Sequence, residues 1–303
     1  MRKKITLYLK YLWVSAIILF VSIYFYSHID LIIKTIDIIP IFNLTIALLA
    51  LLIAKIFLSY IALLSVQYSN YHMSFFKAFK IYNITQLAKY IPGSIWQFVG
   101  KAGAYGKDGM DLHIVKKSIF IEMFFVLMSS FLIGFFLIFL TNIINLDSLY
   151  LLFFKYEYII IIILLIIFLI LVFFRRKIKS FYLIFKGNSL LNIRLFVTLT
   201  IVWLLLGISF YITIAPFIDN NLLLFLSIIG LYSLSYGVGF LVPFAPAGLG
   251  IREAVLVAGI SPFVSFDIAT ILVAMNRVLY IITEVLIVFI LIIYSKFSKE
   301  KTT

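Results

Sequence analysis

Long apolar runs alternate with short polar or basic segments along the chain. Residues 159–174 read IIIIILLIIFLILVFF, without one side chain that forms hydrogen bonds. At about 1.5 Å of rise per residue, a helix over 156–174 would cover roughly the hydrocarbon core of a bilayer. This pattern predicts an all-α polytopic integral membrane protein, formed as a single transmembrane helical domain over residues 1–303.

Seven apolar stretches are long enough to be transmembrane helices. They cover residues 11–27, 41–66, 118–140, 151–174, 195–215, 222–242 and 266–294. Residues 1–26 have the basic start of a signal peptide. Their apolar part is long, however, and no small-residue cleavage site follows, so we expect a retained first helix.

Basic residues gather in alternate connections. Lysines and arginines are frequent at the N-terminus and in residues 67–117 and 175–194, whereas residues 28–40, 141–150 and 215–221 contain only Lys34. The positive-inside rule therefore places the N-terminus and the two basic segments in the cytoplasm. The lysines after residue 294 indicate a cytoplasmic C-terminus as well.

A cytoplasmic C-terminus requires two more crossings after residue 242. Only 266–294 reads as an ordinary helix, so the other crossing must lie within 243–265, which is short and interrupted by proline and glycine. We predict eight passages, one of them broken. Seven passages with a re-entrant hairpin is the alternative, giving about seven to eight transmembrane helices.

Composition agrees with a membrane protein. Hydrophobic residues make up 65% of the chain and charged residues 12%, against about a quarter in soluble domains, so no sizeable soluble domain fits. The net charge of +13 is expected to face anionic lipid headgroups and not nucleic acid. The chain has no cysteine, no metal-ligand spacing around its histidines and no nucleotide-binding motif, so no cofactor or metal is expected.

Two segments concentrate the helix-breaking residues. Residues 89–109 and 243–256 contain, in order, Pro92, Gly93, Gly100, Gly103 and Gly106, then Pro243, Pro246, Gly248 and Gly250. Irregular backbone at membrane depth survives only against protein or a wet cavity, and transporters bind substrates at such breaks. We expect a binding site there; ordinary cytoplasmic turns are the alternative. The preceding residues 74–90 predict an interfacial or shallow helix that ends at Ile91, before Pro92.

The second broken segment carries the clearer chemistry. Gly248 and Gly250 directly precede Arg252, Glu253 and a helix-forming AVLVA. Such a turn opens a helix with free backbone amides that suit an anion, and the arginine fork suits phosphate. Glu253 would hold that arginine or pair elsewhere. In the alternative interpretation, an Arg252–Glu253 pair merely fixes the break.

Four charged residues fall inside predicted spans, where charge is costly and usually faces a bundle interior or a cavity. They are Lys55, Glu122, Arg277 and Glu284. We expect Arg277 to bind a headgroup, and Glu122 and Glu284 to be proton carriers or counter-ions for the arginines; static buried pairs are the alternative. Lys55 is expected to extend toward the interface.

Three residues of the first broken segment are further candidates. Trp96 is interpreted as an interfacial anchor, or else as a residue that lines a headgroup pocket with Lys89 and Lys101.

The two broken segments resemble a known family. KYIPGSIWQFVGK (89–101) and PFAPAGLGIREAVL (243–256) are similar to the signature segments of the lysylphosphatidylglycerol synthase transmembrane-region family, also called flippase-like. The resemblance implies residence in a prokaryotic inner membrane and handling of a phospholipid or lipid-linked molecule. It also implies a set of family-type positions, namely Pro92, Gly93, Trp96, Gly100, Gly248, Gly250, Arg252 and Glu253.

Two departures from the best-known members of the family are visible. Ala247 stands where the family commonly has another glycine, which stiffens the turn. Those members also fuse this region to a cytosolic aminoacyl-transferase, and none follows residue 303, so we do not expect this chain to synthesise a lysyl-lipid by itself.

The leading hypothesis is a lipid flippase or lipid-translocation component for an anionic phospholipid or a lipid-linked envelope precursor. One alternative is a membrane-embedded transferase, which would need two of its scattered carboxylates (Glu122, Glu253, Asp267, Glu284) to meet. Another is a non-catalytic membrane partner of a separate synthase. Membrane lipids and envelope-biosynthesis enzymes are the expected partners, and the oligomeric state stays open.

Overall fold

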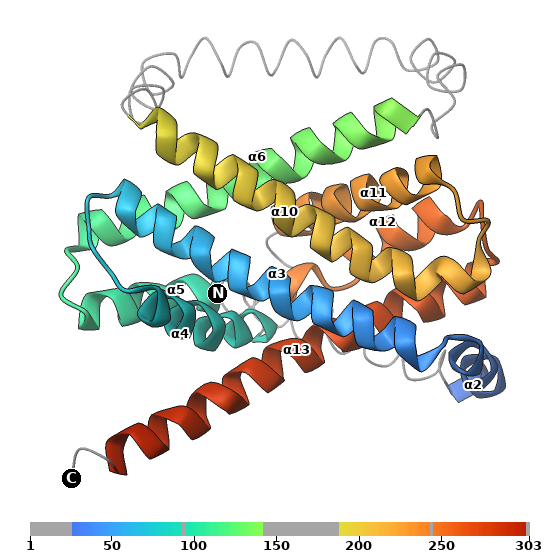
Figure 1. Ribbon diagram of the computed structural model, residues 1–303, viewed down its shortest axis with the longest axis horizontal. Coiled ribbons are helices and arrows are strands. Elements are labelled where there is room, and N and C mark those ends of the chain that lie inside the picture. The colour runs from blue at the N-terminus through green and yellow to red at the C-terminus, as the bar shows by residue number, and fades with distance from the viewer. Residues whose placement is uncertain (1–25, 92–94, 142–187, 243–244, 301–303) are drawn as a thin grey trace, which may run out of the picture.

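The computed structural model describes residues 26–91, 95–141, 188–242 and 245–300 (Figure 1). All regular secondary structure in these ranges is helical. The elements are α2 (Ile29–Ile38), α3 (Ile41–Tyr68), α4 (Phe75–Gln86), the 3₁₀ helix η1 (Leu87–Tyr90), α5 (Trp96–Lys107), α6 (Leu112–Thr141), α10 (Ser189–Ile214), η2 (Ala215–Phe217), α11 (Leu222–Leu241), η3 (Pro246–Gly248), α12 (Ile251–Ile260) and α13 (Phe266–Glu300).

Five helices in the described ranges are long and apolar enough to cross a membrane. They run over Ile41–Tyr68, Leu112–Thr141, Ser189–Phe217, Leu222–Leu241 and Phe266–Ser295. Each coincides with one of the predicted apolar stretches, so the prediction of an all-α multi-pass membrane protein is confirmed. The stretch 151–174 and nearly all of 11–27 lie outside the described residues.

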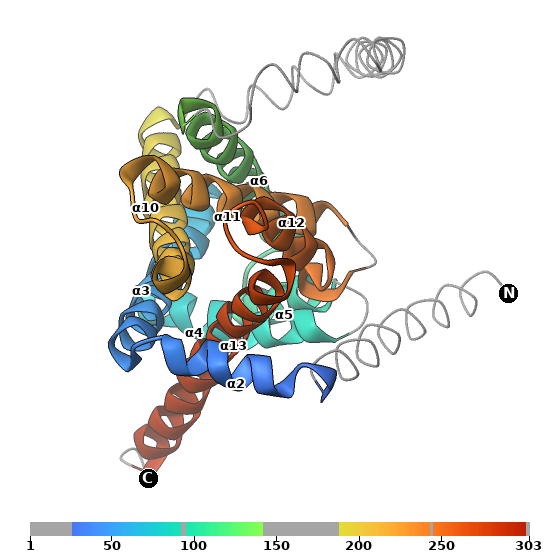
Figure 2. The same cartoon turned by 90° about the vertical axis from the view of Figure 1, so that its right-hand side faces the viewer.

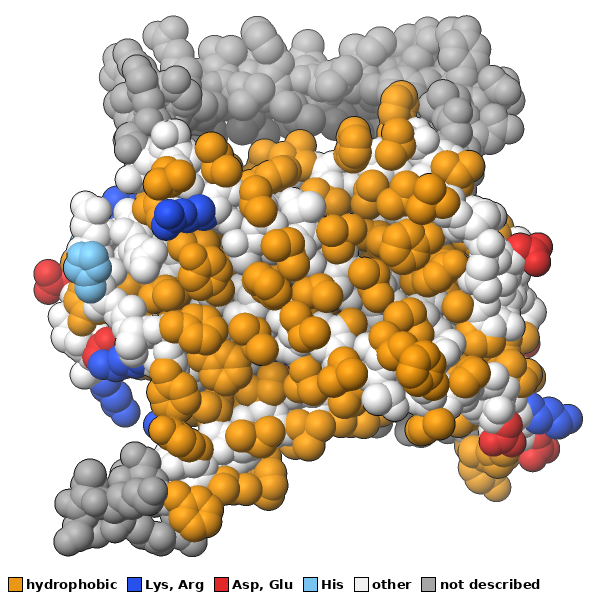
Figure 3. Space-filling model, viewed as in Figure 1, with side chains coloured by type: hydrophobic (Ala, Val, Ile, Leu, Met, Phe, Trp, Pro, Cys, Tyr) orange, Lys and Arg blue, Asp and Glu red, His pale blue; other side chains and the backbone are white. Residues whose placement is uncertain are grey.

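The surface agrees with this assignment. Figure 3 shows hydrophobic side chains covering the middle of one face, whereas charged side chains gather at its two ends. Phe135, Phe136 and Phe139 on α6 are all exposed. Exposed phenylalanines at this density would be costly in water and are stabilised by contact with lipid chains.

The last three helices reverse direction twice. In Figure 1, α11 and α13 run from right to left, while α12 runs back between them and packs against both. A helix of ten residues is about 15 Å long, roughly half a bilayer core, so α12 cannot cross alone. The C-terminus therefore reaches the end of the molecule that holds α4 and α5, an arrangement that a broken passage and a re-entrant hairpin at 243–265 would both give. Which end faces the cytoplasm stays a prediction.

Small residues allow the spans to approach closely. A Cβ added at Gly134 of α6 would lie 2.5 Å from Leu234 Cγ and 3.0 Å from the carbonyl oxygen of Gly230 on α11. Close backbone contact of this kind replaces hydrophobic burial as the force between helices in lipid. Around it, α3 packs along α10, and Trp203 of α10 is fully buried and donates to Ser129 Oγ of α6 at 2.9 Å.

Two connections differ from the sequence-based prediction. Residues 28–40 were expected to be a plain connection, but they contain α2, which packs against α13 (Figure 2). The glycines at 100, 103 and 106 were expected to break the backbone, but they lie within α5. Added Cβ atoms at 103 and 106 would meet nothing within 4 Å, so these two glycines lie on the open face of the helix. By contrast, the predicted break at Ile91 is confirmed, because this residue is extended (φ −72°, ψ 130°) directly after η1.

Candidate functional site

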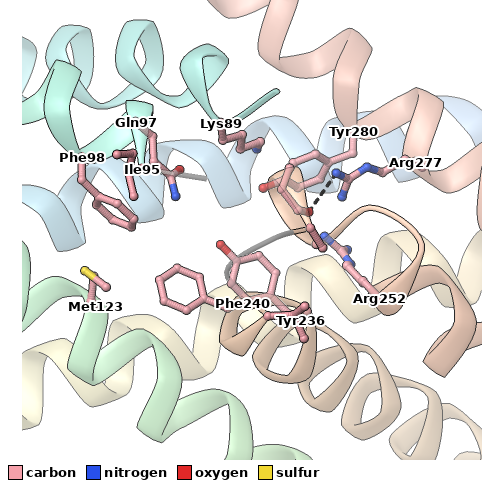
Figure 4. A pocket seen from close by; sticks show the side chains of 15 residues that line it. Lys89, Ile95, Gln97, Phe98, Met123, Tyr236, Phe240, Arg252, Arg277 and Tyr280 are labelled. Carbon is pink, nitrogen blue, oxygen red and sulfur yellow. Dashed lines mark hydrogen bonds between the residues drawn. The ribbon is translucent and has the colours of Figure 1, made fainter. Parts of the chain in front are cut away.

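The two broken segments meet in the middle of the bundle. η1 packs against η3, although about 150 residues separate them in sequence, and Figure 4 shows side chains from both sides facing a common space. Neither segment lies isolated at a surface. They bound a cavity with a volume of about 290 Å³.

Three of the four residues in the turn at 247–250 have a left-handed backbone. Ala247, Gly248 and Gly250 all have positive φ, at 52°, 71° and 84°. Gly248 also lies against the backbone of Gly239 on α11, where an added Cβ would come within 3.2 Å of three main-chain atoms. The N–H of Gly250 then donates to Glu253 Oε2 at 2.8 Å, which closes the N-terminus of the helix.

Arg252 is the central cation of this site. It is only 5% exposed, and its guanidinium carbon lies 4.4 Å from the ring centre of Tyr232 and 5.4 Å from that of Tyr236. Tyrosine faces stabilise a guanidinium without neutralising it. Among the described residues, no hydrogen bond or ion pair reaches its side chain, which lines the cavity. Arg252 therefore presents an uncompensated positive charge to that cavity.

Arg277 holds the turn from the opposite side. From α13 its Nη2 donates to the carbonyl oxygen of Ala247 at 3.1 Å, and its Nε lies 3.5 Å from Glu253 Oε1. Of the two possibilities considered for Glu253, the pair with its neighbour Arg252 does not form. Glu253 pairs with Arg277 instead, and the guanidinium of Arg252 packs against tyrosine rings.

A second ionic cluster borders the same space. Lys55 of α3 and Lys89 of η1 both donate to Glu284 Oε1, while the hydroxyl of Tyr90 donates to Oε2 at 2.8 Å. Lys55 is fully buried, and its Nζ lies 3.9 Å from the ring centre of Tyr280. The prediction that Lys55 extends toward the interface is therefore wrong. A carboxylate on a neighbouring span was available to it, which sequence spacing could not show.

A third ion pair joins Lys101 of α5 to Glu122 of α6. Lys101 Nζ lies 2.5 and 2.7 Å from the two carboxylate oxygens of Glu122, and 4.8 Å from the ring centre of Tyr82. Glu122 lines a smaller hollow of about 30 Å³ that shares several lining residues with the main cavity. Glu122, Glu253 and Glu284 each pair with a lysine or arginine, and in the described ranges no three acidic or histidine side chains gather as metal ligands would.

The cavity has two chemically different ends. Figure 4 shows Lys89, Arg252, Arg277 and Tyr280 toward one end, and Phe98, Met123, Phe240 and Ile95 at the other, with Gln97 as the polar side chain among them. Ile95 is also 58% exposed, so the apolar end reaches the surface of the bundle. This arrangement suits a molecule with an anionic head and a hydrocarbon tail.

The predicted site residues fall into three groups. Four of them line the cavity, namely Lys89, Gly248, Arg252 and Arg277. Glu253, Gly250 and Glu284 contact or position those residues without lining it. Trp96 and Gly100 lie on the exposed side of α5, Lys101 pairs with Glu122, and Pro92 and Gly93 lie outside the described residues.

Tyrosines are the part of the site that the sequence analysis missed. Tyr232, Tyr236 and Tyr280 surround Arg252, and Tyr90 and Tyr280 contact the lysine cluster. Spacing gives a weak signal for them in retrospect. Tyr232 and Tyr236 lie four residues apart on one face of α11, and Tyr280 follows Arg277 by three on α13.

The sequence model of the family described as Lysylphosphatidylglycerol synthase TM region matches residues 11–287. The chain belongs to this family. The match covers both broken segments and confirms the resemblance expected from them. A search of curated proteins found no match.

Membership in the lysylphosphatidylglycerol synthase TM region family agrees with the observed fold. The family is a membrane region by description, and a lipid-related function in the membrane is compatible with it. The cavity between η1 and η3 lies where the two segments that first indicated the family come together.

Proposed function

We propose that this protein binds the headgroup of an anionic phospholipid or lipid-linked envelope precursor in the central cavity and moves it between the leaflets of the membrane. The observation that carries the proposal is Arg252, a buried arginine that lines the cavity and has no carboxylate partner among the described residues. A buried charge without a partner is costly, and binding an anion there recovers that cost.

The shape of the cavity supports a lipid and not a free anion. Its cationic end lies against η3 and α13, and its apolar end, at Phe98, Met123 and Phe240, continues to the exposed Ile95. A free phosphate would leave that apolar wall unused. An acyl or prenyl chain would lie along it, with the headgroup on Arg252.

The broken passage supplies the means of movement. The turn at 247–250 contributes Ala247 and Gly248 to the cavity wall and reverses the chain between α11 and α12, and the extended Ile91 ends η1 two residues after Lys89, which also lines the cavity. Small rotations at such breaks change which side of a central site is open. Movement of the lipid would follow its gradient, or be coupled to protons or to the membrane potential.

A scrambling assay tests the proposal. The purified protein is reconstituted into liposomes with a fluorescent anionic phospholipid, and accessibility to dithionite is followed over time. The wild type should expose inner-leaflet lipid, and Arg252→Ala should abolish this activity. Arg194→Ala is the matched control, because Arg194 is exposed at the start of α10. Equal rates for wild type, Arg252→Ala and empty liposomes would refute translocation.

A further inference from the structure

We infer that the lipid bound here carries two negative charges on a terminal phosphate, as a phosphomonoester or a diphosphate does, and that Lys89 selects it over a phosphodiester. This inference rests on the proposed function. It deepens that function by naming the class of headgroup.

The first argument is the charge balance around Glu284. Two lysines, Lys55 and Lys89, bind one carboxylate oxygen of this residue, and both are buried. One carboxylate neutralises only one ammonium. With both ammonium groups protonated, the cluster holds one positive charge in excess, in a place where excess charge is costly.

The two lysines are not equivalent. Lys89 lines the cavity, whereas Lys55 lies outside its lining and is held under the ring of Tyr280. If Lys89 turned toward a ligand, Glu284 would keep Lys55 on Oε1 and the hydroxyl of Tyr90 on Oε2. Glu284 therefore keeps a cation when Lys89 turns away, and Lys89 is the one of the two lysines that faces the cavity.

The second argument is the balance of the whole cavity. Arg277 is matched by Glu253, and Arg252 has no acidic partner in the described part of the chain. Four cations thus face two carboxylates. The excess is two positive charges, one on Arg252 of α12 and one on the lysine cluster, and both reach the same cavity.

A phosphodiester headgroup would neutralise only one of these charges. A phosphomonoester carries close to two negative charges above its second pKa, which is about 6, and a diphosphate carries at least as many. Such a group would bind Arg252 with one oxygen and draw Lys89 from Glu284 with another. The cavity should therefore bind a doubly charged headgroup more tightly than a singly charged one.

Binding in detergent at pH 8 tests this selectivity on the full chain. The probes are phosphatidic acid and phosphatidylglycerol with identical acyl chains, and farnesyl diphosphate as a prenyl diphosphate. The wild type should bind phosphatidic acid at least about tenfold more tightly than phosphatidylglycerol, which corresponds to about 1.4 kcal/mol. The relative affinity of farnesyl diphosphate then distinguishes the two doubly charged classes.

Variants assign the preference to Lys89. Lys89→Met should bring the ratio of the two affinities close to one, and Lys89→Arg should keep the preference. Lys107→Met is the matched control at an exposed lysine of α5. In Lys55→Met, Lys89 is the last ammonium bound to Glu284 and is held there more strongly, so the affinity for phosphatidic acid should fall by about tenfold. Adding Glu284→Gln removes the carboxylate that holds Lys89 and should restore this affinity.

The outcomes separate the two levels of the proposal. A wild-type ratio near one overturns the inference and needs no variant, so it does not depend on how any variant folds. A preference that persists in a folded Lys89→Met variant also overturns it. If Arg252→Ala weakens both lipids while the wild type shows no preference, the proposed function stands and the inference falls. If Arg252→Ala changes neither affinity, the proposed function itself fails.

Discussion

Arg277 and Ala247 are joined by a hydrogen bond of 3.1 Å from the guanidinium Nη2 to the main-chain carbonyl oxygen, across 30 residues of sequence. The same guanidinium faces Glu253 through Nε at 3.5 Å. One side chain on α13 thus holds both the turn that precedes α12 and the first turn of that helix. The shape of the cavity depends on this tie, because Ala247, Gly248 and Arg252 all line it.

Replacing Arg277 with methionine should destabilise the protein. The change leaves a half-buried carboxylate of Glu253 without its cation and the carbonyl of Ala247 without a donor, at a cost of about 3 kcal/mol. Thermal unfolding in detergent should show a clearly lower midpoint. Glu253→Gln should cost less, because the amide oxygen can still accept from the N–H of Gly250. Equal midpoints for Arg277→Met and wild type would contradict this role.

Ala247 should respond to substitution according to its backbone. Its φ of 52° and ψ of 23° lie in the left-handed region, which costs a residue with a Cβ about 1 kcal/mol. Ala247→Gly removes that strain and should keep or raise the unfolding midpoint, although glycine also adds entropy to the unfolded chain. Ala247→Val adds a branched side chain in the same conformation and should lower it. A higher unfolding midpoint for Ala247→Val than for Ala247→Gly would show that the turn is not held in this conformation.

The span pattern could be predicted because it depends on composition alone. Each apolar stretch that falls in the described residues forms a long helix. The distribution of charged connections also predicted that 243–265 would be irregular, and this segment contains the turn at 247–250 and the short helix α12. The glycines of α5 show the limit of this reasoning. Glycine permits a break without requiring one, and the sequence could not show that residues 96–107 would form a helix.

The partners of the buried charges could not be predicted. Lys55 and Glu284 are 229 residues apart, and their pairing depends on how α3, η1 and α13 pack. Sequence indicated that Glu122, Arg277 and Glu284 face a bundle interior or a cavity, but it did not show their partners, and it placed Lys55 at the interface. The same limit explains why Glu253 was considered as a partner for its neighbour Arg252, when the rotation of α12 directs it to Arg277.

The shared carboxylate predicts an order of stabilities among variants. Glu284→Met leaves two buried lysines unpaired and should cost about 3 kcal/mol or more. Lys55→Met combined with Glu284→Met leaves only one unpaired lysine and should be more stable than Glu284→Met alone. Lys55→Met by itself should be mildest, because Lys89 and Glu284 still pair. Thermal unfolding of the three variants measures this order, and a double variant less stable than Glu284→Met would contradict it.

The close contact of α6 and α11 predicts opposite effects for two glycine substitutions. Gly134→Ala places a Cβ 2.5 Å from Leu234 Cγ and 3.0 Å from the carbonyl oxygen of Gly230, so the side chain of Leu234 or the spans themselves must shift and the midpoint should fall. Gly103→Ala on α5 meets nothing within 4 Å and should stabilise that helix by about 1 kcal/mol. A tolerated Gly134→Ala would mean that α6 and α11 lie farther apart than described here.

Cysteine labelling tests the orientation that the positive-inside rule predicts. The chain has no cysteine, so a single introduced one reports its own location. His72 is exposed in the connection before α4, and Asp219 is exposed between α10 and α11, at the opposite end of the bundle. In intact cells or spheroplasts, a membrane-impermeant maleimide should label Asp219→Cys directly. It should label His72→Cys only after the membrane is permeabilised, because residues 67–117 carry many lysines and should be cytoplasmic. The reverse pattern would invert the topology, and it would place the end of the molecule that holds α4 and α5 outside the cell.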